Sequence, residues 1–265
     1  MDQFPRLFEV AEQAGQKASI PLDAAELRNF ATAEAMVPRL GPNFNAPPLS
    51  QEWFQAIAEK RHGRHGEWLP RHLEFNRHQR ERVICLGSCL GTDWVNYALN
   101  AAEVTVAAET RLLEPILMNF QWQGLSVNVL PSDSGTVALP DESADVIAAN
   151  WMLDDEAPFR WASEVTRLLK PGGKILALVR ARWNLKRITR FRWWMTESAW
   201  TRKSLARLLP DFDEIRVRQR QLRRSEVPGI LRFIPMPLLE RMAGNALILK
   251  AFKPLAIREE TRIAA

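Results

Sequence analysis

The sequence predicts an α/β protein with a doubly wound, mostly parallel sheet, and three observations support this fold class. From residue 82 onward, short apolar runs of strand type alternate with stretches of helical periodicity. The first apolar run ends in a turn that contains two glycines. With 265 residues, 46% hydrophobic and 25% charged, the chain is large enough to bury a core. Strands separated by helices imply right-handed crossovers and helices on both faces of the sheet.

Residues 1–81 are expected to form an N-terminal helical extension. Asp23 and Ser50 are expected N-caps, because each precedes a run of helical periodicity. In the third helix the apolar residues recur on one face, so this helix is expected to dock against a core. They are Trp53, Phe54, Ile57 and Ala58. The expected helices span 4–15, 21–37 and 50–63.

The main domain is expected at 82–255, followed by a C-terminal tail at 256–265. Its helices are expected at 92–102 and 110–124, and a further helix should end at Pro171, because proline cannot continue a helix. The buried face of the helix at 110–124 should contain Leu113, Leu117 and Phe120. The predicted strands span 83–87, 103–109, 127–133, 144–150, 174–179 and 245–252.

Charge is distributed unevenly along a chain whose formal net charge is +5. Residues 1–82 are neutral, 83–179 carry −7, 180–224 carry +10 and 225–265 carry +2. An acidic middle followed by a basic stretch indicates that two surfaces meet different partners or meet each other.

The cysteines and histidines argue against a disulfide framework and against a metal site. Cys85 and Cys89 lie four residues apart in one segment, so they are expected to be reduced. All four histidines fall within the segment 59–78, but their spacing matches no zinc pattern, and Arg61, Arg64 and Arg71 would repel a cation. We therefore expect this segment to be a solvated, basic linker.

No signal for export or membrane insertion is readable. The first residues lack a basic region followed by an apolar one, and no run of about 18 uncharged apolar residues occurs. A cytoplasmic location is the expectation.

The turn from Gly87 to Asp93 is the first candidate for a binding site. In a doubly wound sheet, ligands lie beyond the carboxyl ends of the strands, where the strand order reverses. Gly87 permits a tight turn, and the following helix offers free backbone N–H groups. Taken alone, a strand-to-helix turn with incidental glycines explains the pattern equally well. Two acids strengthen it: Glu109 could accept hydrogen bonds from ribose hydroxyls, and Asp133 from a purine amine.

Two longer motifs identify a family. The stretch from Asp133 to Asp145 has an Asp, a short loop, a Pro-Asp pair, a Ser and an Asp before a strand, and the stretch from Glu164 to Lys174 reads EVTRLLKPGGK. With VICLGSCLG before them, they resemble class I S-adenosylmethionine-dependent methyltransferases, especially those of small molecules and lipids. The resemblance implies a Rossmann-like fold and S-adenosylmethionine as cofactor. The cofactor-binding residues that it implies are Gly87, Ser88, Cys89, Gly91, Glu109, Asp133, Ser134 and Asn150.

The chain departs from the family pattern at three positions. Cys85 stands where the family generally has an acid near the methionine amino group, and Cys89 replaces the middle glycine. Ala108 occupies one register of the ribose-binding acid, so Glu109 serves only if the second strand ends one residue later. These changes keep open a second reading, a catalytically silent methyltransferase fold that acts as a binding or scaffold protein.

No catalytic acid or base is assigned. A sulfonium already activates its methyl group, so alignment of the reactants supplies most of the rate. After the strand at 144–150, Trp151 could line the methyl site or belong to the core, and Asp154 and Asp155 fit the start of a helix.

The acceptor is expected to be small and hydrophobic or amphipathic, with methylation at oxygen, nitrogen or carbon. Residues 180–240 are basic and rich in tryptophan, and the family commonly inserts substrate-covering helices after the fifth strand. The stretch from Arg180 to Trp200 could bind nucleic acid, contact an anionic membrane peripherally, or form a lid. The apolar, proline-rich segment that follows favours a lid over a nucleic-acid groove. An RNA or protein methyltransferase remains an alternative.

Overall fold

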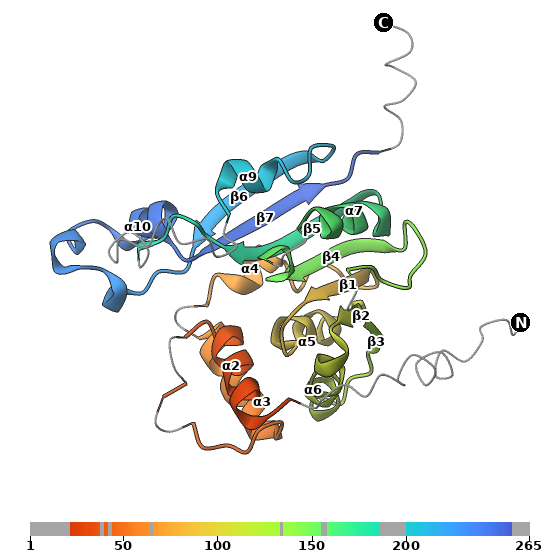
Figure 1. Ribbon diagram of the computed structural model, residues 1–265, viewed down its shortest axis with the longest axis horizontal. Helices are drawn as coiled ribbons and strands as arrows, with labels where there is room; N and C mark the ends of the chain where they lie inside the picture. The colour runs from red at the N-terminus through yellow and green to blue at the C-terminus, as the bar shows by residue number, and fades with distance from the viewer. Residues whose placement is uncertain are drawn as a thin grey trace, which may run out of the picture.

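The computed structural model describes residues 22–37, 40–41, 44–63, 66–132, 135–154, 158–185 and 200–255. A seven-stranded sheet in the order β3-β2-β1-β4-β5-β7-β6 forms its centre (Figure 1). The strand order reverses between β1 and β4, which are neighbours in the sheet, so their carboxyl ends flank the switch point of the fold. The doubly wound α/β class is therefore confirmed.

The first five strands are parallel, and β7 lies antiparallel between β5 and β6. The strand bounds are β1 Arg82–Gly87, β2 Glu103–Ala108, β3 Asn128–Pro131, β4 Ala144–Asn150, β5 Leu169–Arg180, β6 Asp213–Arg220 and β7 Ala246–Phe252.

Helices cover both faces of the sheet (Figure 1). One face packs against α2 (Ala24–Glu34), α3 (Gln51–His62), α4 (Leu69–Leu73), α5 (Thr92–Leu99) and α6 (Thr110–Trp122). The other packs against α7 (Pro158–Leu168) and α9 (Arg202–Ala206). Alternate residues of β1 divide between the two cores, with Cys85 on the α5 side and Leu86 on the α7 side. Beyond the sheet, α10 (Met236–Ala243) follows the short helices η2 (Arg224–Glu226) and η3 (Gly229–Leu231).

The N-terminal extension shares the core of the sheet domain. Asp23 caps α2 with a capping box, and the Ser50 hydroxyl caps α3, as their sequence positions predict. Trp53, Phe54 and Ile57 are buried in the same cluster as β1 and α5, while Ala58 is half-buried. The expected helix at 4–15 lies outside the described residues.

Four sequence-based expectations are wrong. The histidine segment is not a solvated linker, because Arg61 and His78 are fully buried. The buried face of α6 is displaced from the expected one, which leaves Leu113 and Leu117 half-buried. Helix α7 ends at Leu168 rather than at Pro171, since Leu169 already pairs with Ala144 of β4. The buried residues of α6 are Leu112, Pro115, Ile116, Asn119 and Phe120. Those of α7 are Trp161, Ala162, Glu164, Val165 and Leu168.

The fourth concerns the strands. The third strand ends at Pro131, two residues before Asp133, and β6 has no counterpart among the predicted strands. Because β6 is an edge strand on which charged residues alternate with half-buried ones, it lacks the continuous apolar run that marks the buried strands. Within the described residues, no helix has the length and apolar character needed to cross a membrane.

We predict that the docked extension contributes to global stability. Phe54→Ala should lower the free energy of unfolding by about 3–5 kcal/mol, because it empties a buried aromatic site shared by α3 and the sheet core. Phe159→Ala, at a phenylalanine that is 75% exposed on α7, is the control and should change stability by less than about 0.5 kcal/mol. Urea unfolding followed by circular dichroism measures both, and equal effects would contradict a shared core.

Candidate cofactor site

A cavity of about 340 Å³ lies at the carboxyl ends of the parallel strands, beside the switch point. It is lined by Gly87, Ser88, Ala108, Glu109, Ser132, Gly135, Met152 and Trp161. These residues follow or end β1, β2, β3 and β4, except Trp161, which belongs to α7. The topology therefore gathers the ends of four strands around one hollow.

Gly87 is required by the close approach of two strands. It has φ 146°, and it pairs with Asn150 across the β1–β4 ladder. A Cβ atom at this position would lie 2.1 Å from the Asn150 carbonyl oxygen, so any larger residue would push β1 and β4 apart.

Strand β2 ends at Ala108, one residue earlier than the ribose-binding role of Glu109 was expected to require. Glu109 nevertheless borders the cavity. It precedes the first turn of α6, and its carboxylate accepts hydrogen bonds from Ser88 Oγ at 3.3 Å and from Arg111 Nε at 2.7 Å. The hydrogen bond to Glu109 raises the pKa of Arg111. The side chain of Glu109 is 39% exposed, and a carboxylate can accept more hydrogen bonds than these two.

The turn after β1 is held from outside the sheet domain by Glu34, at the end of α2. One carboxylate oxygen accepts from the backbone N–H of Leu90 and the other from that of Thr92, both at 2.8 Å. Glu34 is buried, and Thr92 is the first residue of α5. The backbone N–H groups of Leu90 and Thr92, which were expected to be free for a ligand, are thus bonded to the protein itself.

A second buried charge completes this junction. Arg61 of α3 donates through Nε to Asp93 Oδ1 at 2.6 Å, and its other nitrogens bond Asp93 Oδ2 and the Glu34 carbonyl oxygen. Asn150 at the end of β4 donates to Asp93 Oδ2 at 2.9 Å, and His62 Nε2 lies 3.0 Å from Oδ1. Burial alone would raise the pKa of Asp93, but the Arg61 guanidinium holds that pKa far below its ordinary value. Asp93 is therefore ionised, its charge is balanced by Arg61, and it links α3 to the end of β4.

The remaining predicted residues divide into two groups. Cys89, Gly91 and Asn150 are buried and do not line the cavity, while Asp133 and Ser134 lie outside the described residues. Neither cysteine forms a disulfide, and burial raises the pKa of both the Cys85 and the Cys89 thiol well above its ordinary value. Protonated, buried thiols are poor nucleophiles.

Sequence reasoning missed several residues of this region. Met152 and Trp161 line the cavity, while Glu34 holds the turn after β1 and Arg61 bonds Asp93 of α5. Glu34 carried one signal, a lone charge in the otherwise apolar end of its helix, ATAEAMV. The described residues contain no group of three or more His, Cys, Asp or Glu that could hold a metal ion. Trp151 is half-buried against the core on the α5 side and, like Cys89, does not line the cavity.

Comparisons with known proteins point to one family. Residues 84–177 match a family model described as a methyltransferase domain. A phosphoethanolamine N-methyltransferase from Haemonchus contortus, solved with S-adenosyl-L-methionine, is 13% identical, with 90% of this chain and 61% of that one covered and a TM-score of 0.55.

Two shorter proteins match along nearly their whole length. The S-adenosylmethionine-dependent methyltransferase from Archaeoglobus fulgidus is 16% identical over 76% of this chain and 100% of its own (TM-score 0.52). The one from Aquifex aeolicus is 15% identical over 77% and 98% (TM-score 0.52). No curated protein sequence gave a significant match.

We predict that Glu34 stabilises the turn. Glu34→Ala should lower the free energy of unfolding by about 1–3 kcal/mol, because two buried N–H groups lose their acceptor. Glu114→Ala, at an exposed glutamate of α6, is the matched control and should be near neutral. Thermal and urea unfolding measure the difference; two equal values would mean that the carboxylate does not carry this contact.

Proposed function

Because residues 84–177 match a methyltransferase domain and the sheet has the fold of S-adenosylmethionine-dependent methyltransferases, we propose that this enzyme transfers a methyl group from S-adenosylmethionine to a small, amphipathic acceptor. The observation that carries the proposal is the cavity at the β1–β4 switch point, which is bordered by an accessible carboxylate and by the turn after β1. The acceptor class is the finer part of the proposal.

The residues around the cavity fit the cofactor. Glu109 has two carboxylate oxygens to accept from the two ribose hydroxyls, and Ser88 holds that carboxylate at the cavity wall. Met152 and Trp161 supply an apolar wall suited to a planar base. Asp133 and Ser134 keep their predicted roles as further contacts.

The chain's own part in the reaction is to position groups and to exclude water. Bound S-adenosylmethionine supplies a methyl group on a positively charged sulfur, which needs little acid or base assistance. The junction of Glu34, Arg61 and Asp93 fixes the turn and the end of β4, so the cavity floor is formed before any ligand arrives. The buried Cys85 and Cys89 thiols take no part as nucleophiles.

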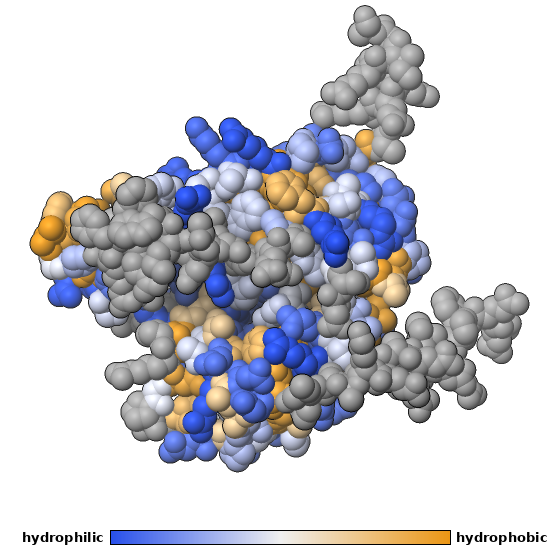
Figure 2. All heavy atoms as spheres, viewed as in Figure 1, coloured by the Kyte–Doolittle hydropathy of each residue, from blue (hydrophilic) through white to orange (hydrophobic). Residues whose placement is uncertain are grey.

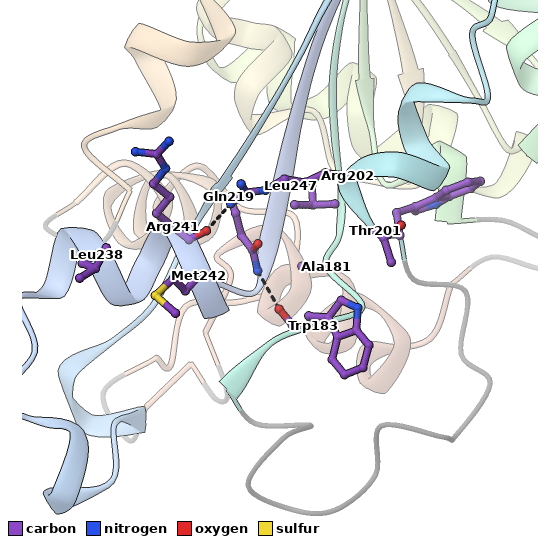
Figure 3. A pocket seen from close by; sticks show the side chains of 10 residues that line it. Ala181, Trp183, Thr201, Arg202, Gln219, Leu238, Arg241, Met242 and Leu247 are labelled. Atoms are coloured by element: carbon purple, nitrogen blue, oxygen red, sulfur yellow. Dashed lines mark hydrogen bonds between the residues drawn. The ribbon is translucent and has the colours of Figure 1, made fainter.

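A second, larger cavity supports an amphipathic acceptor. It measures about 470 Å³ and lies beyond β5, at the sheet edge where β5 ends, β7 begins and β6 ends (Figure 3). Its lining combines apolar side chains with Arg202 and Arg241, which suits a molecule with an apolar body and an anionic group. Its lining residues are Ala181, Trp183, Trp200, Thr201, Arg202, Gln219, Leu238, Arg241, Met242 and Leu247.

Gln219 and Arg202 fix the walls of this cavity. Gln219 Nε2 donates to the carbonyl oxygens of Trp183 at 2.7 Å and of Gly244 at 2.8 Å, and Arg202 donates to the Arg241 carbonyl oxygen. Figure 3 shows Gln219 directed toward Trp183. The cavity is therefore framed by hydrogen bonds between segments far apart in the sequence.

One observation favours the alternative of a silent binding or scaffold protein. Glu34 already uses two N–H groups of the turn, and Asp93, the carboxylate beside Cys85, is neutralised by Arg61. In that case the fold would keep its junction but would not need to bind S-adenosylmethionine.

We predict that titration calorimetry detects S-adenosylmethionine binding to the parent protein. Glu109→Ala should weaken binding by about 1–3 kcal/mol, because hydrogen bonds to a charged acceptor are lost. Glu103→Ala, at the opposite end of β2, is the control and should bind as the parent does.

Three results would count against the proposal. Parent-like affinity in Glu109→Ala would remove the ribose contact from this residue. Absence of binding to the parent at millimolar cofactor would favour the scaffold. The small acceptor would be rejected if the protein binds S-adenosylmethionine and forms S-adenosylhomocysteine when RNA or protein is added, but not when amphipathic alcohols, amines or carboxylates are added.

A further inference from the structure

The segment 216–245, which we name the arginine lobe, begins within β6 and continues through η2, η3 and α10, and its part beyond β6 projects from one end of the sheet (Figure 1). It contains seven arginines and two glutamates, so its formal charge of +5 equals that of the whole chain. Both glutamates are half-buried and bonded within the lobe. Glu226 accepts from the Arg223 backbone N–H and from Asn245, and Glu240 lies 3.6 Å from Arg220.

The same lobe exposes apolar side chains. Ile230 and Phe233 are 79% and 82% exposed, and Leu238 and Met242, one turn apart on α10, are 49% and 64% exposed. Figure 2 shows hydrophobic surface at this end of the molecule. Four such residues within 13 positions make a patch rather than scattered exceptions.

These side chains are exposed on a folded element. Leu185, Leu222, Val227, Leu239 and Ala243 form a separate buried cluster beneath the lobe. The exposed apolar residues of the lobe therefore face outward while other apolar residues of the same segment are packed. Their exposure is thus not the result of an unformed core.

We propose that the arginine lobe docks on an anionic lipid bilayer, with Ile230 and Phe233 entering the interface and the exposed Arg224, Arg232 and Arg241 at headgroup depth. Exposed apolar side chains and exposed arginines in one segment match the two attractions that hold a protein on such a surface, burial of apolar area and charge. The cavity beside α10, which shares Leu238, Met242 and Arg241 with the lobe, would open toward the membrane.

Charge and side-chain type argue against other occupants. A second copy would bring a second +5 surface against the first, with both glutamates of each lobe already engaged. Single-stranded nucleic acid would need several aromatic stacking platforms, whereas only Phe233 among the four exposed apolar side chains is aromatic. Attachment to lipid holds whichever acceptor the enzyme methylates.

The test is co-sedimentation of the full chain, without cofactor, with vesicles of phosphatidylcholine alone or mixed with phosphatidylglycerol. The parent should bind the mixed vesicles and not the neutral ones. Ile230→Ser/Phe233→Ser should lower the partition coefficient by at least about tenfold. Leu99→Ser/Phe159→Ser removes two exposed apolar side chains elsewhere and should bind as the parent does.

Arginine variants provide an independent arm. Arg224→Gln/Arg232→Gln should weaken binding to the mixed vesicles by about fivefold per arginine. Arg77→Gln/Arg82→Gln, at arginines exposed outside the lobe, is the charge control. Unfolding midpoints verify that all variants fold; if the serine variant does not, the arginine pair decides.

Several outcomes would overturn the proposal. The first is that the parent does not bind the mixed vesicles, and the second is that lobe and control variants bind equally. The third is that the parent is a dimer which Ile230→Ser/Phe233→Ser converts to a monomer. The fourth is that the parent binds RNA and the arginine variant does not.

Discussion

The bond from Glu34 to the turn after β1 is the contact on which the rest of the site depends. A carboxylate buried at the start of α5 meets two N–H groups that have no partner within the helix, and the positive end of the helix favours its charge. Because Glu34 comes from α2, the turn that borders the cofactor cavity is formed partly by the N-terminal extension. Arg61 adds a second link, from α3 to Asp93 and the Glu34 carbonyl oxygen.

This junction connects the two sides of the switch point. Asp93 belongs to α5, which follows β1, and Asn150 ends β4, so their hydrogen bond joins the strands that flank the cavity. Removal of Arg61 would leave the buried Asp93 carboxylate with only His62 and Asn150 as partners, which is destabilising. The apolar residues of the extension lie in the same core as those of β1 and α5, so the extension and the sheet are packed as one body.

Much of the fold could be predicted from local pattern, and the junction could not. The caps at Asp23 and Ser50 and the bounds of β4 follow from residues adjacent in sequence. The partners of Glu34 are 56 and 58 residues away, and no periodicity connects them. Strand β6 was not predicted because, as an edge strand with little buried surface, it has no continuous apolar run in its sequence. Arg61 was assigned to solvent from its basic neighbours, although Asp93 supplies its partner from another helix.

The affinity of the folded Glu34→Ala variant for S-adenosylmethionine tests the central claim most directly. If Glu34 forms the turn that the cofactor needs, calorimetric titration should show binding weaker than the parent's by about tenfold, because the turn must be ordered on binding. Affinity equal to the parent's, or higher, would contradict this account, since it would mean that the extension is independent of the cofactor site or competes with the cofactor for the same N–H groups.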